Sequence, residues 1–318
     1  MLKKISIYGL LLMIVLLFIL SVDNLYKFKN EILDHSQLEP PKKSDEISVH
    51  PQLEPLKKSN ELLEIDLYST NAVLVNLDEN TILMDKNSEE RIYPASLTKL
   101  MTVLVAIENI PDLEEKILLR KSIFPHLNAA NASMAGFLPN EKVKAKDLLY
   151  GSMLPSGAEA SIGLANFIAG SEREFVKLMN EKAQQLGMKD THFKNVTGLH
   201  HIDHYTSVKD ISILLQYALT NNTFRDVFTT KRYSISPTNL HPKGMTFLST
   251  MFTKASSDLP KGEIIGGKTG YTEEAGLCLA SLALINGQEY ILVTVGAKGD
   301  HYTEQYNITD AISVYSRL

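Results

Sequence analysis

Residues 263–296 read EIIGGKTGYT-EE-AGLCLASLALI-NG-QEYILVTVG, three apolar segments separated by two short breaks. The segments Glu263 to Thr272, Ala275 to Ile285 and Gln288 to Gly296 are long enough for strands and rich in residues that strands favour. Asn286-Gly287, between the last two segments, is a strong signal for a two-residue hairpin turn. The stretch therefore predicts three consecutive antiparallel strands.

The chain before these strands predicts a second hairpin and a block of helices. The apolar runs Ala72 to Leu77 and Thr81 to Asp85 flank a short polar turn. From about Ser96 to Phe228, apolar residues recur mostly at helical spacing, and a last helix is expected over roughly Tyr302 to Arg317. We predict an α+β fold in which the first hairpin joins the last three strands in one antiparallel sheet of about five strands. Helices flank this sheet, and a mainly helical subdomain lies beside it.

Composition sets broad limits on function. The chain has 318 residues, 44% of them hydrophobic, so a sizeable core can form. The net charge of −5 gives no basic field for nucleic acid. The single cysteine, Cys278, excludes an internal disulfide and cysteine-based metal sites, and its apolar neighbours predict a buried core residue.

The N-terminus predicts export. Lys3 and Lys4 precede an apolar run from Ile5 to Val22, which suits a membrane anchor over residues 1–22 with the following chain outside the cytoplasm. The end of this run has no small-residue cleavage site, which favours a retained anchor. A cleaved signal peptide is the alternative.

A polar segment follows the apolar run. Residues 23–65 are rich in proline, lysine and glutamate, and residues 35–46 are echoed by residues 50–61 with a period of 15 residues. Such mixed-charge, proline-containing chain is typically extended and acts as a spacer. We therefore expect a linker over 23–65 and a catalytic domain over 66–318.

Three short motifs carry the candidate chemistry. Ser96 and Lys99 lie three residues apart at the start of a predicted helix, so hydroxyl and amine share one face and the amine can serve as base. Lys268-Thr269-Gly270 lies in a glycine-rich strand to which a peptide substrate could pair by its edge. Ser156 follows an apolar helix and could relay a proton. Each motif alone is weak, and a capped helix, an exposed lysine or a turn would explain it equally well.

Together, the motifs and their flanks resemble the serine D-Ala-D-Ala carboxypeptidases, the low-mass penicillin-binding proteins. The order and spacing match, and so does the segment Tyr93-Pro94-Ala95-Ser96-Leu97-Thr98-Lys99-Leu100-Met101-Thr102. Residues 143–151, 195–207 and 270–276 are also similar to the family. The resemblance covers roughly residues 66–318 and implies the β-lactamase/transpeptidase-like fold.

The resemblance implies a role for each site residue. Ser96 would attack the carbonyl between two terminal D-alanines, Lys99 would take its proton, and Ser156 would pass a proton to the leaving amine. The segment Lys268-Thr269-Gly270-Tyr271 would bind substrate, with Lys268 and Thr269 on the terminal carboxylate and the N–H groups of Ser96 and Tyr271 as the oxyanion hole. The expected partners are a peptidoglycan pentapeptide ending in D-Ala-D-Ala and, as covalent inhibitors, β-lactams. No metal or cofactor is implied.

The sequence departs from the family pattern at Ala158. The second motif of the family is usually S-x-N, whose asparagine contacts the lysine and the substrate amide, whereas this chain reads Ser156-Gly157-Ala158. This departure puts the rate and the β-lactam affinity in question more than the reaction class. Together with the N-terminal anchor, it suggests the N-anchored relatives associated with glycopeptide resistance.

Three alternatives remain open on the sequence. A zinc peptidase would use the cluster His200-His201-Ile202-Asp203-His204, although no H-E-x-x-H motif is present. A serine β-lactamase would need a glutamate to activate the deacylating water, and no matching E-x-x-L-N segment follows Ser156. A penicillin-binding sensor would acylate on Ser96 without turnover. Hydrolysis and transpeptidation are not separated by the sequence.

Overall fold

The computed structural model describes residues 56–318. The predicted anchor and all but the last residues of the predicted linker lie outside the described residues. Lys57 and Lys58, within the predicted linker, pair with a strand of the main sheet. No helix among residues 56–318 is both long and apolar enough to cross a membrane.

Within the described residues, seven strands form one sheet in the order β1-β3-β2-β11-β10-β9-β8. Its strands are β1 (Lys57–Lys58), β2 (Asn71–Asn76), β3 (Thr81–Lys86), β8 (Asp258–Leu259), β9 (Gly262–Thr272), β10 (Gly276–Ile285) and β11 (Gln288–Ala297). The first hairpin joins the last three strands through the antiparallel β2–β11 pair, as the sequence predicts. The Asn286-Gly287 turn is also confirmed, with φ of 51° and 82° at its two residues.

The sheet contains the five predicted strands and two further short strands at its edges. β1 and β8 extend the sheet to seven strands, and β1 runs parallel to β3. Both added strands have two residues, which is too short to produce a hydrophobic alternation in the sequence. Their pairing depends on the sheet that the longer strands have already formed.

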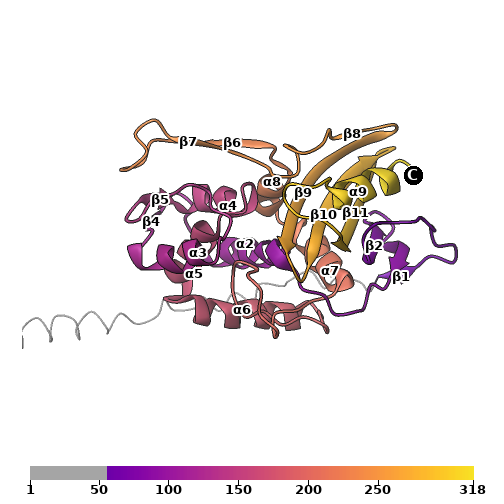
Figure 1. The fold of residues 1–318 in the computed structure, drawn as a ribbon, viewed down its shortest axis with the longest axis horizontal. Helices are drawn as coiled ribbons and strands as arrows, with labels where there is room; N and C mark the ends of the chain where they lie inside the picture. Colours follow the sequence, from indigo (N-terminus) through magenta and orange to yellow (C-terminus); the bar gives the residue numbers. More distant parts are fainter. Residues whose placement is uncertain (1–55) are drawn as a thin grey trace, which may run out of the picture. The chain divides into compact units, whose positions relative to one another are not determined.

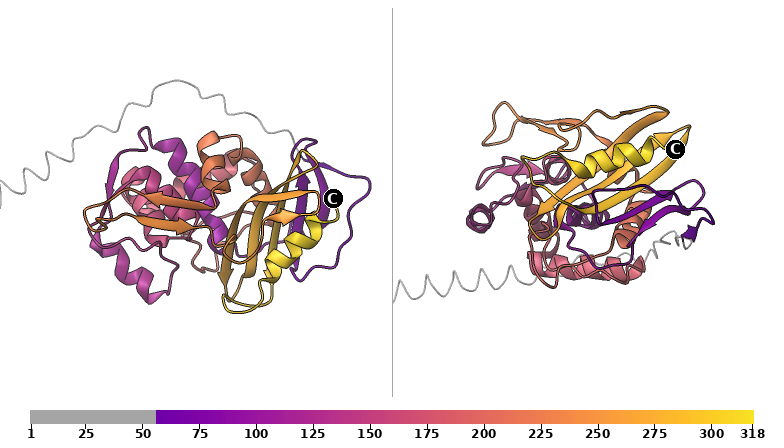
Figure 2. Two further views of the ribbon diagram at one scale, coloured as in Figure 1. Left: turned by 90° about the horizontal axis from the view of Figure 1, so that it is seen from above. Right: turned by 45° about the vertical axis from the view of Figure 1, so that its right-hand side comes forward.

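Helices cover both faces of the sheet and form a subdomain beside it (Figures 1 and 2). They are α2 (Thr98–Asn109), α3 (Phe124–Ala129), α4 (Ala145–Met153), α5 (Ala158–Ala169), α6 (Glu172–Gln185), α7 (Val208–Ala218), α8 (Asn222–Thr229) and α9 (Tyr306–Tyr315), with the short 3₁₀ turns η2 (Ala95–Leu97) and η3 (Lys121–Ile123). α9 packs on β10 and β11, and α7 packs on β2 and β11. Helices α2 to α6 lie together to one side (Figure 1).

Two short two-stranded sheets in this region were not predicted. β4 (Lys116–Leu118) pairs with β5 (Lys142–Lys144), and β6 (Arg232–Ile235) pairs with β7 (Met245–Leu248). The β6–β7 arm extends over α4 in Figure 1, where the Tyr233 ring stacks on Tyr150 with centroids 3.6 Å apart. Sequence patterns miss such sheets because strands of three or four residues carry little periodicity.

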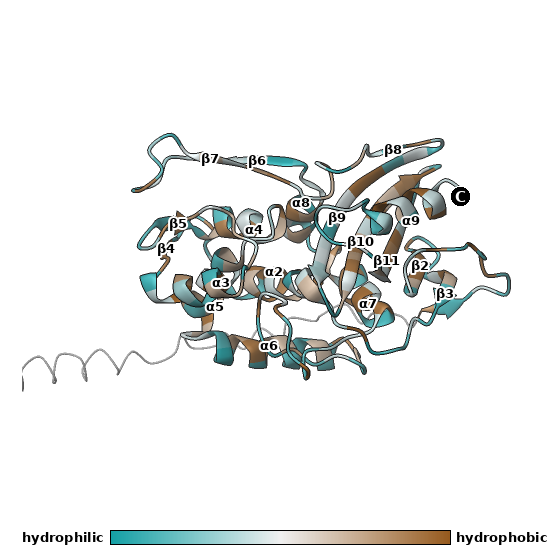
Figure 3. Ribbon diagram, in the orientation of Figure 1, coloured by the Kyte–Doolittle hydropathy of each residue, from teal (hydrophilic) through white to brown (hydrophobic). Residues whose placement is uncertain are grey.

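Alternate residues of the central strands enter two different hydrophobic cores. On β2, Val73 and Val75 pack into the core shared with α2 and α7, whereas Ala72 and Leu74 pack into the core beneath α9. This is the period of two expected of a strand buried on both faces. Hydrophobic residues run along β9, β10 and β11, and α6 alternates between hydrophobic and hydrophilic segments (Figure 3). Cys278 is fully buried, as predicted.

The core packing predicts a contrast between two leucines of the sheet. Leu74→Ala removes a side chain with 0% exposure, so it should lower the free energy of unfolding by about 2–5 kcal/mol. Leu284→Ala, at a side chain with 38% exposure on β10, should cost only about 0.5 kcal/mol. Urea denaturation with unchanged m-values measures both losses. Equal losses in the two variants would contradict the two-core arrangement.

Candidate active site

Ser96 lies on the tight turn η2, directly before α2. Ala95 has φ of 46°, a left-handed conformation that is rare for a residue with a Cβ. The turn is held by the Thr98 hydroxyl, which donates to the Ala95 carbonyl at 2.8 Å, and by the Leu97 N–H, which donates to the Pro94 carbonyl at 3.0 Å. Such strain at a reactive residue marks a site where the fold fixes one geometry.

Two glycines allow other segments to approach this turn. A Cβ on Gly198, whose φ is 84°, would lie 1.8 Å from the Ala95 carbonyl oxygen. A Cβ on Gly270 would lie 3.1 Å from the Ser96 nitrogen. The glycine of the third motif therefore lets β9 lie against the turn that carries Ser96.

Lys99 is buried beside Ser96. Its side chain lies on the next turn of helix, and Nζ donates to Ser96 Oγ at 3.1 Å and to the Thr197 carbonyl at 2.5 Å. Only 2% of the residue is exposed. Burial lowers the pKa of Lys99 to about 7, against the opposing effect of the Glu159 carboxylate. A substantial fraction of the amine is therefore neutral at neutral pH, as a base requires.

Ser156 and Lys268 form a second hydroxyl–amine pair. Ser156, with φ of 65°, lies between α4 and α5 and accepts a hydrogen bond from Lys268 Nζ at 3.0 Å. Lys268 also donates to the Thr269 carbonyl at 2.8 Å. Burial, reinforced by the charge of Lys99, holds the pKa of Lys268 well below its ordinary value. The two lysines are thus electrostatically coupled.

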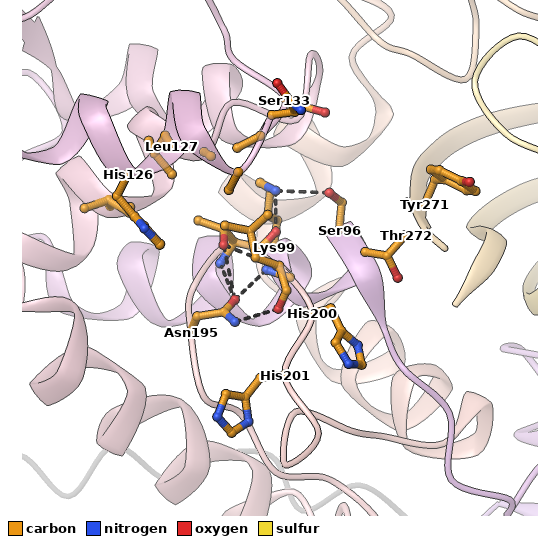
Figure 4. Close-up of a pocket in the computed structure, with 18 of the residues that line it drawn as sticks. Ser96, Lys99, His126, Leu127, Ser133, Asn195, His200, His201, Tyr271 and Thr272 are labelled. Atoms are coloured by element: carbon orange, nitrogen blue, oxygen red, sulfur yellow. Dashed lines mark hydrogen bonds between the residues drawn. The ribbon is translucent and has the colours of Figure 1, made fainter. Parts of the chain in front are cut away.

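The open part of the site is a cleft of about 890 Å³. Ser96, Lys99 and Ala158 line it, with Tyr271 and Thr272 from the end of β9. Figure 4 shows Ser96 between Lys99 and Tyr271. The predicted residues Ser156, Lys268 and Thr269 do not line this cleft themselves. Lys268 and Thr269 directly precede Gly270, which lies against the turn that carries Ser96, and Ser156 is hydrogen-bonded to Lys268.

Sequence reasoning missed Thr250. Its hydroxyl forms a 2.7 Å hydrogen bond with that of Thr269, so the hydroxyl predicted to bind a carboxylate already has a fixed neighbour. Thr250 lies in the loop between β7 and β8, outside the three motifs. Its position follows only from the folded chain.

Glu159, adjacent to Ala158, was also missed. It is fully buried, and its Oε1 accepts hydrogen bonds from the N–H groups of Ala135, Gly136 and Phe137 at 2.7–3.2 Å. Burial raises the pKa of Glu159, although these N–H groups oppose the shift. An acidic residue in the first turn of an otherwise apolar helix was the available signal in the sequence.

The histidine cluster does not converge. His204 is buried, and its ring nitrogens bond the Thr98 hydroxyl at 2.7 Å and the Lys194 N–H at 3.0 Å. Burial lowers the pKa of His204 to about 3, so the ring is neutral. His200 instead faces Glu274 at 3.5 Å. Within residues 56–318, no three His, Cys, Asp or Glu side chains are grouped in a way that would suit a metal ion.

These contacts are the ones expected of a serine hydrolase that works through an acyl-enzyme. A serine on a strained turn contacts a buried lysine with a pKa near neutrality, and a glycine-rich strand borders both residues. The family model of the D-alanyl-D-alanine carboxypeptidases, peptidase S11, matches residues 57–299. The chain belongs to this family.

Known relatives agree with this assignment. The chain is 36% identical over 227 residues to the D-alanyl-D-alanine carboxypeptidase DacF of Bacillus subtilis, covering 71% of this chain and 57% of the relative. It is 31% identical over 225 residues to the D-alanyl-D-alanine carboxypeptidase of Streptomyces sp. strain K15, covering 68% of this chain and 77% of that protein. The alignment thus spans little more than half the length of DacF.

Solved structures show the same fold. The crystal structure of the Streptomyces K15 DD-transpeptidase has a TM-score of 0.71 and 27% sequence identity, covering 80% of this chain and 99% of that one. The expected α+β fold of penicillin-binding proteins is therefore confirmed.

The pKa of Lys99 predicts how the reactivity of Ser96 depends on pH. Because only the neutral amine accepts a proton, acylation by a fluorescent penicillin should be slow below pH 6, rise with a midpoint near 7 and level off above 8. Glu159→Gln removes a charge that raises this pKa, so the midpoint should move to lower pH. Glu89→Gln, at an exposed carboxylate, is the matched control and should leave the midpoint in place. A midpoint above 9 in the unaltered protein would contradict the assignment of Lys99 as the base.

Proposed function

We propose that this chain is a serine DD-carboxypeptidase that removes the terminal D-Ala from peptidoglycan precursors ending in D-Ala-D-Ala, through an acyl-enzyme on Ser96. The observation that carries the proposal is the contact between Ser96 and the buried Lys99. Membership of the carboxypeptidase family supplies the substrate class.

Acylation begins when the neutral amine of Lys99 accepts the proton of Ser96. The serine oxygen then attacks the carbonyl carbon of the penultimate D-Ala, and the carbonyl oxygen takes up negative charge. The backbone N–H groups of Ser96 and Tyr271 would donate to this oxygen, because β9 and the serine turn meet at Gly270.

Ser156 would donate a proton to the leaving group. When the tetrahedral intermediate collapses, the C–N bond breaks and the amine of the terminal D-Ala needs a proton. The Ser156 hydroxyl, hydrogen-bonded to Lys268, can supply it and recover a proton through the two lysines. Water then attacks the ester on Ser96, which releases the shortened peptide and restores the serine.

The substrate carboxylate would bind at Lys268 and Thr269. The pKa of Lys268 is low because its ammonium form is buried. An arriving carboxylate would therefore favour protonation of Lys268 and form a charge-assisted hydrogen bond. Thr250 holds the Thr269 hydroxyl in place for the same anion.

We also propose where the enzyme is located in the cell. Residues 1–22 would anchor the protein with its catalytic domain on the extracytoplasmic face of the cell membrane, where peptidoglycan is assembled, and residues 23–65 would act as linker. β-Lactams would acylate Ser96 as substrate mimics. A contribution to glycopeptide resistance would follow from removal of the D-Ala-D-Ala end.

Transpeptidation is a second candidate reaction. The Streptomyces K15 structures carry the name DD-transpeptidase, and this chain covers 99% of the chain in one of them. The same acyl-enzyme would then pass its acyl group to an amine instead of water. Adding glycine to the assay separates the two reactions, because aminolysis yields a peptide ending in glycine.

The decisive assay uses a diacetyl-tripeptide ending in D-Ala-D-Ala. The unaltered protein should release D-Ala, and Ser96→Ala should reduce the rate by about 10³-fold or more, because the nucleophile is lost. Ser249→Ala, at another buried serine, is the matched control and should retain the activity.

Three outcomes would contradict the proposal. A stable penicilloyl adduct without any D-Ala release would indicate a sensor, and rapid penicillin turnover would indicate a β-lactamase. Activity that vanished with a chelator but survived in Ser96→Ala would indicate a metallopeptidase.

A further inference from the structure

The acceptor for the buried Lys99 amine comes from the loop of residues 195–199. Position 158, in the second motif, holds an alanine, whose side chain offers no hydrogen-bond acceptor. Instead, Lys99 Nζ donates to the Thr197 carbonyl at 2.5 Å. Apart from Ser96 Oγ, this is the one hydrogen-bond partner of that amine in the described part of the chain.

Asn195 organises this loop through both ends of its amide. Its Oδ1 accepts from the Thr197 N–H at 3.1 Å, the Thr197 hydroxyl at 3.2 Å and the Gly198 N–H at 2.7 Å. Its Nδ2 donates to the Leu199 carbonyl at 2.8 Å. The Asn195 side chain therefore fixes the peptide planes on both sides of the Thr197 Cα, including the plane that contains the Thr197 carbonyl.

The loop is also held from outside. Glu172 accepts from the Val196 N–H at 3.0 Å, and the Thr102 hydroxyl donates to the Val196 carbonyl at 2.8 Å. Thr102 lies on α2, the helix that carries Lys99, so the same helix holds both the loop and the lysine. Gly198 also lies against the Ala95 carbonyl, so the loop contacts the turn that carries Ser96.

We propose that Asn195 is a positioning residue that fixes the amine of Lys99 through the Thr197 carbonyl. A neutral amine has two N–H groups and one lone pair. Once one N–H is directed to the Thr197 carbonyl, rotation about the last bond of Lys99 is restricted, and the lone pair can be held toward Ser96. The inference rests on the proposed function for the role of Lys99, and it adds Asn195 to the residues on which acylation depends.

A double-mutant cycle tests this role of Asn195, with an asparagine at position 158 as a second amide beside the site. Asn195→Ala should lower the rate of acylation of Ser96 by a fluorescent penicillin about 10- to 100-fold, because the lysine loses its fixed partner. The concentration dependence should locate the loss in the chemical step and not in initial binding. Ala158→Asn, at a position that lines the cleft, should restore most of the loss in the Asn195→Ala background while changing the unaltered protein much less.

Asn180→Ala is the matched control. Asn180 also bonds backbone groups through both ends of its amide, at Val176 and Phe193, but does not reach Lys99. It should lower the melting temperature without lowering the acylation rate. Equal rates for Asn195→Ala and the unaltered protein, or equal effects of Ala158→Asn in both backgrounds, would overturn the proposal.

Asn195→Asp keeps the test valid if the alanine variant does not fold. Aspartate retains the acceptor for Thr197 and Gly198 but brings a carboxylate near Lys99, which raises the pKa of the amine. The acylation rate should therefore reach its plateau at higher pH, and the rate at the plateau should stay close to that of the unaltered protein. An unchanged pH profile would count against the proposal. Release of D-Ala by the unaltered protein is measured separately, so a protein that acylates without releasing D-Ala refutes the proposed function and leaves this inference standing.

Discussion

The site depends on one constraint: an amine must be kept almost free of water and still contact a hydroxyl. Lys99 meets it at 2% exposure and 3.1 Å from Ser96 Oγ. Burial of an ammonium group is costly, so the protein shifts the equilibrium toward the neutral amine instead of supplying a carboxylate partner. The Glu159 carboxylate limits this shift, which leaves the pKa near neutrality and not far below it.

Burial of this kind requires three segments from distant parts of the chain. The turn at Ala95 and Ser96 is approached by the loop around Gly198, where the contact admits only glycine, and by the strand at Gly270, where a Cβ would be a tight fit. The central sheet makes this approach possible, because β9 is paired along its length with β10 and cannot move away from the turn. The helical subdomain closes the other side through α2 and α5. The contacts that pack the core therefore also hold the site residues in place.

Much of this architecture could be predicted from residues alone. The three long C-terminal strands, the first hairpin and the helical start at Ser96 follow from periodicity and turn chemistry, and the structure places each of them within about three residues of the expected bounds. The site motifs were found because S-x-x-K and K-T-G place their groups through local geometry. The hydrogen bond between Ser156 and Lys268, 112 residues apart, was not predicted and is seen only in the folded chain.

The features that escaped prediction share a physical reason. Strands β1 and β8 are too short to show a hydrophobic alternation, and they form by pairing with the edge strands β3 and β9 of the sheet. Thr250, Glu159 and Asn195 act through backbone or side-chain partners that become neighbours only after folding. A polar residue in a loop has the same sequence signature whether it faces solvent or fixes a carbonyl beside a catalytic amine.

The protonation state of Lys99 is the central claim, and it can be measured without any substrate. Lysine labelled with ¹³C at Cε and ¹⁵N at Nζ would be incorporated into the folded protein and titrated by NMR, with the Lys99 signal assigned by its loss in Lys99→Arg. We expect this signal to titrate near pH 7, while exposed lysines titrate near 10.4. A titration of Lys99 together with the exposed lysines would show that the amine remains charged beside Ser96, and the account of the site would be wrong.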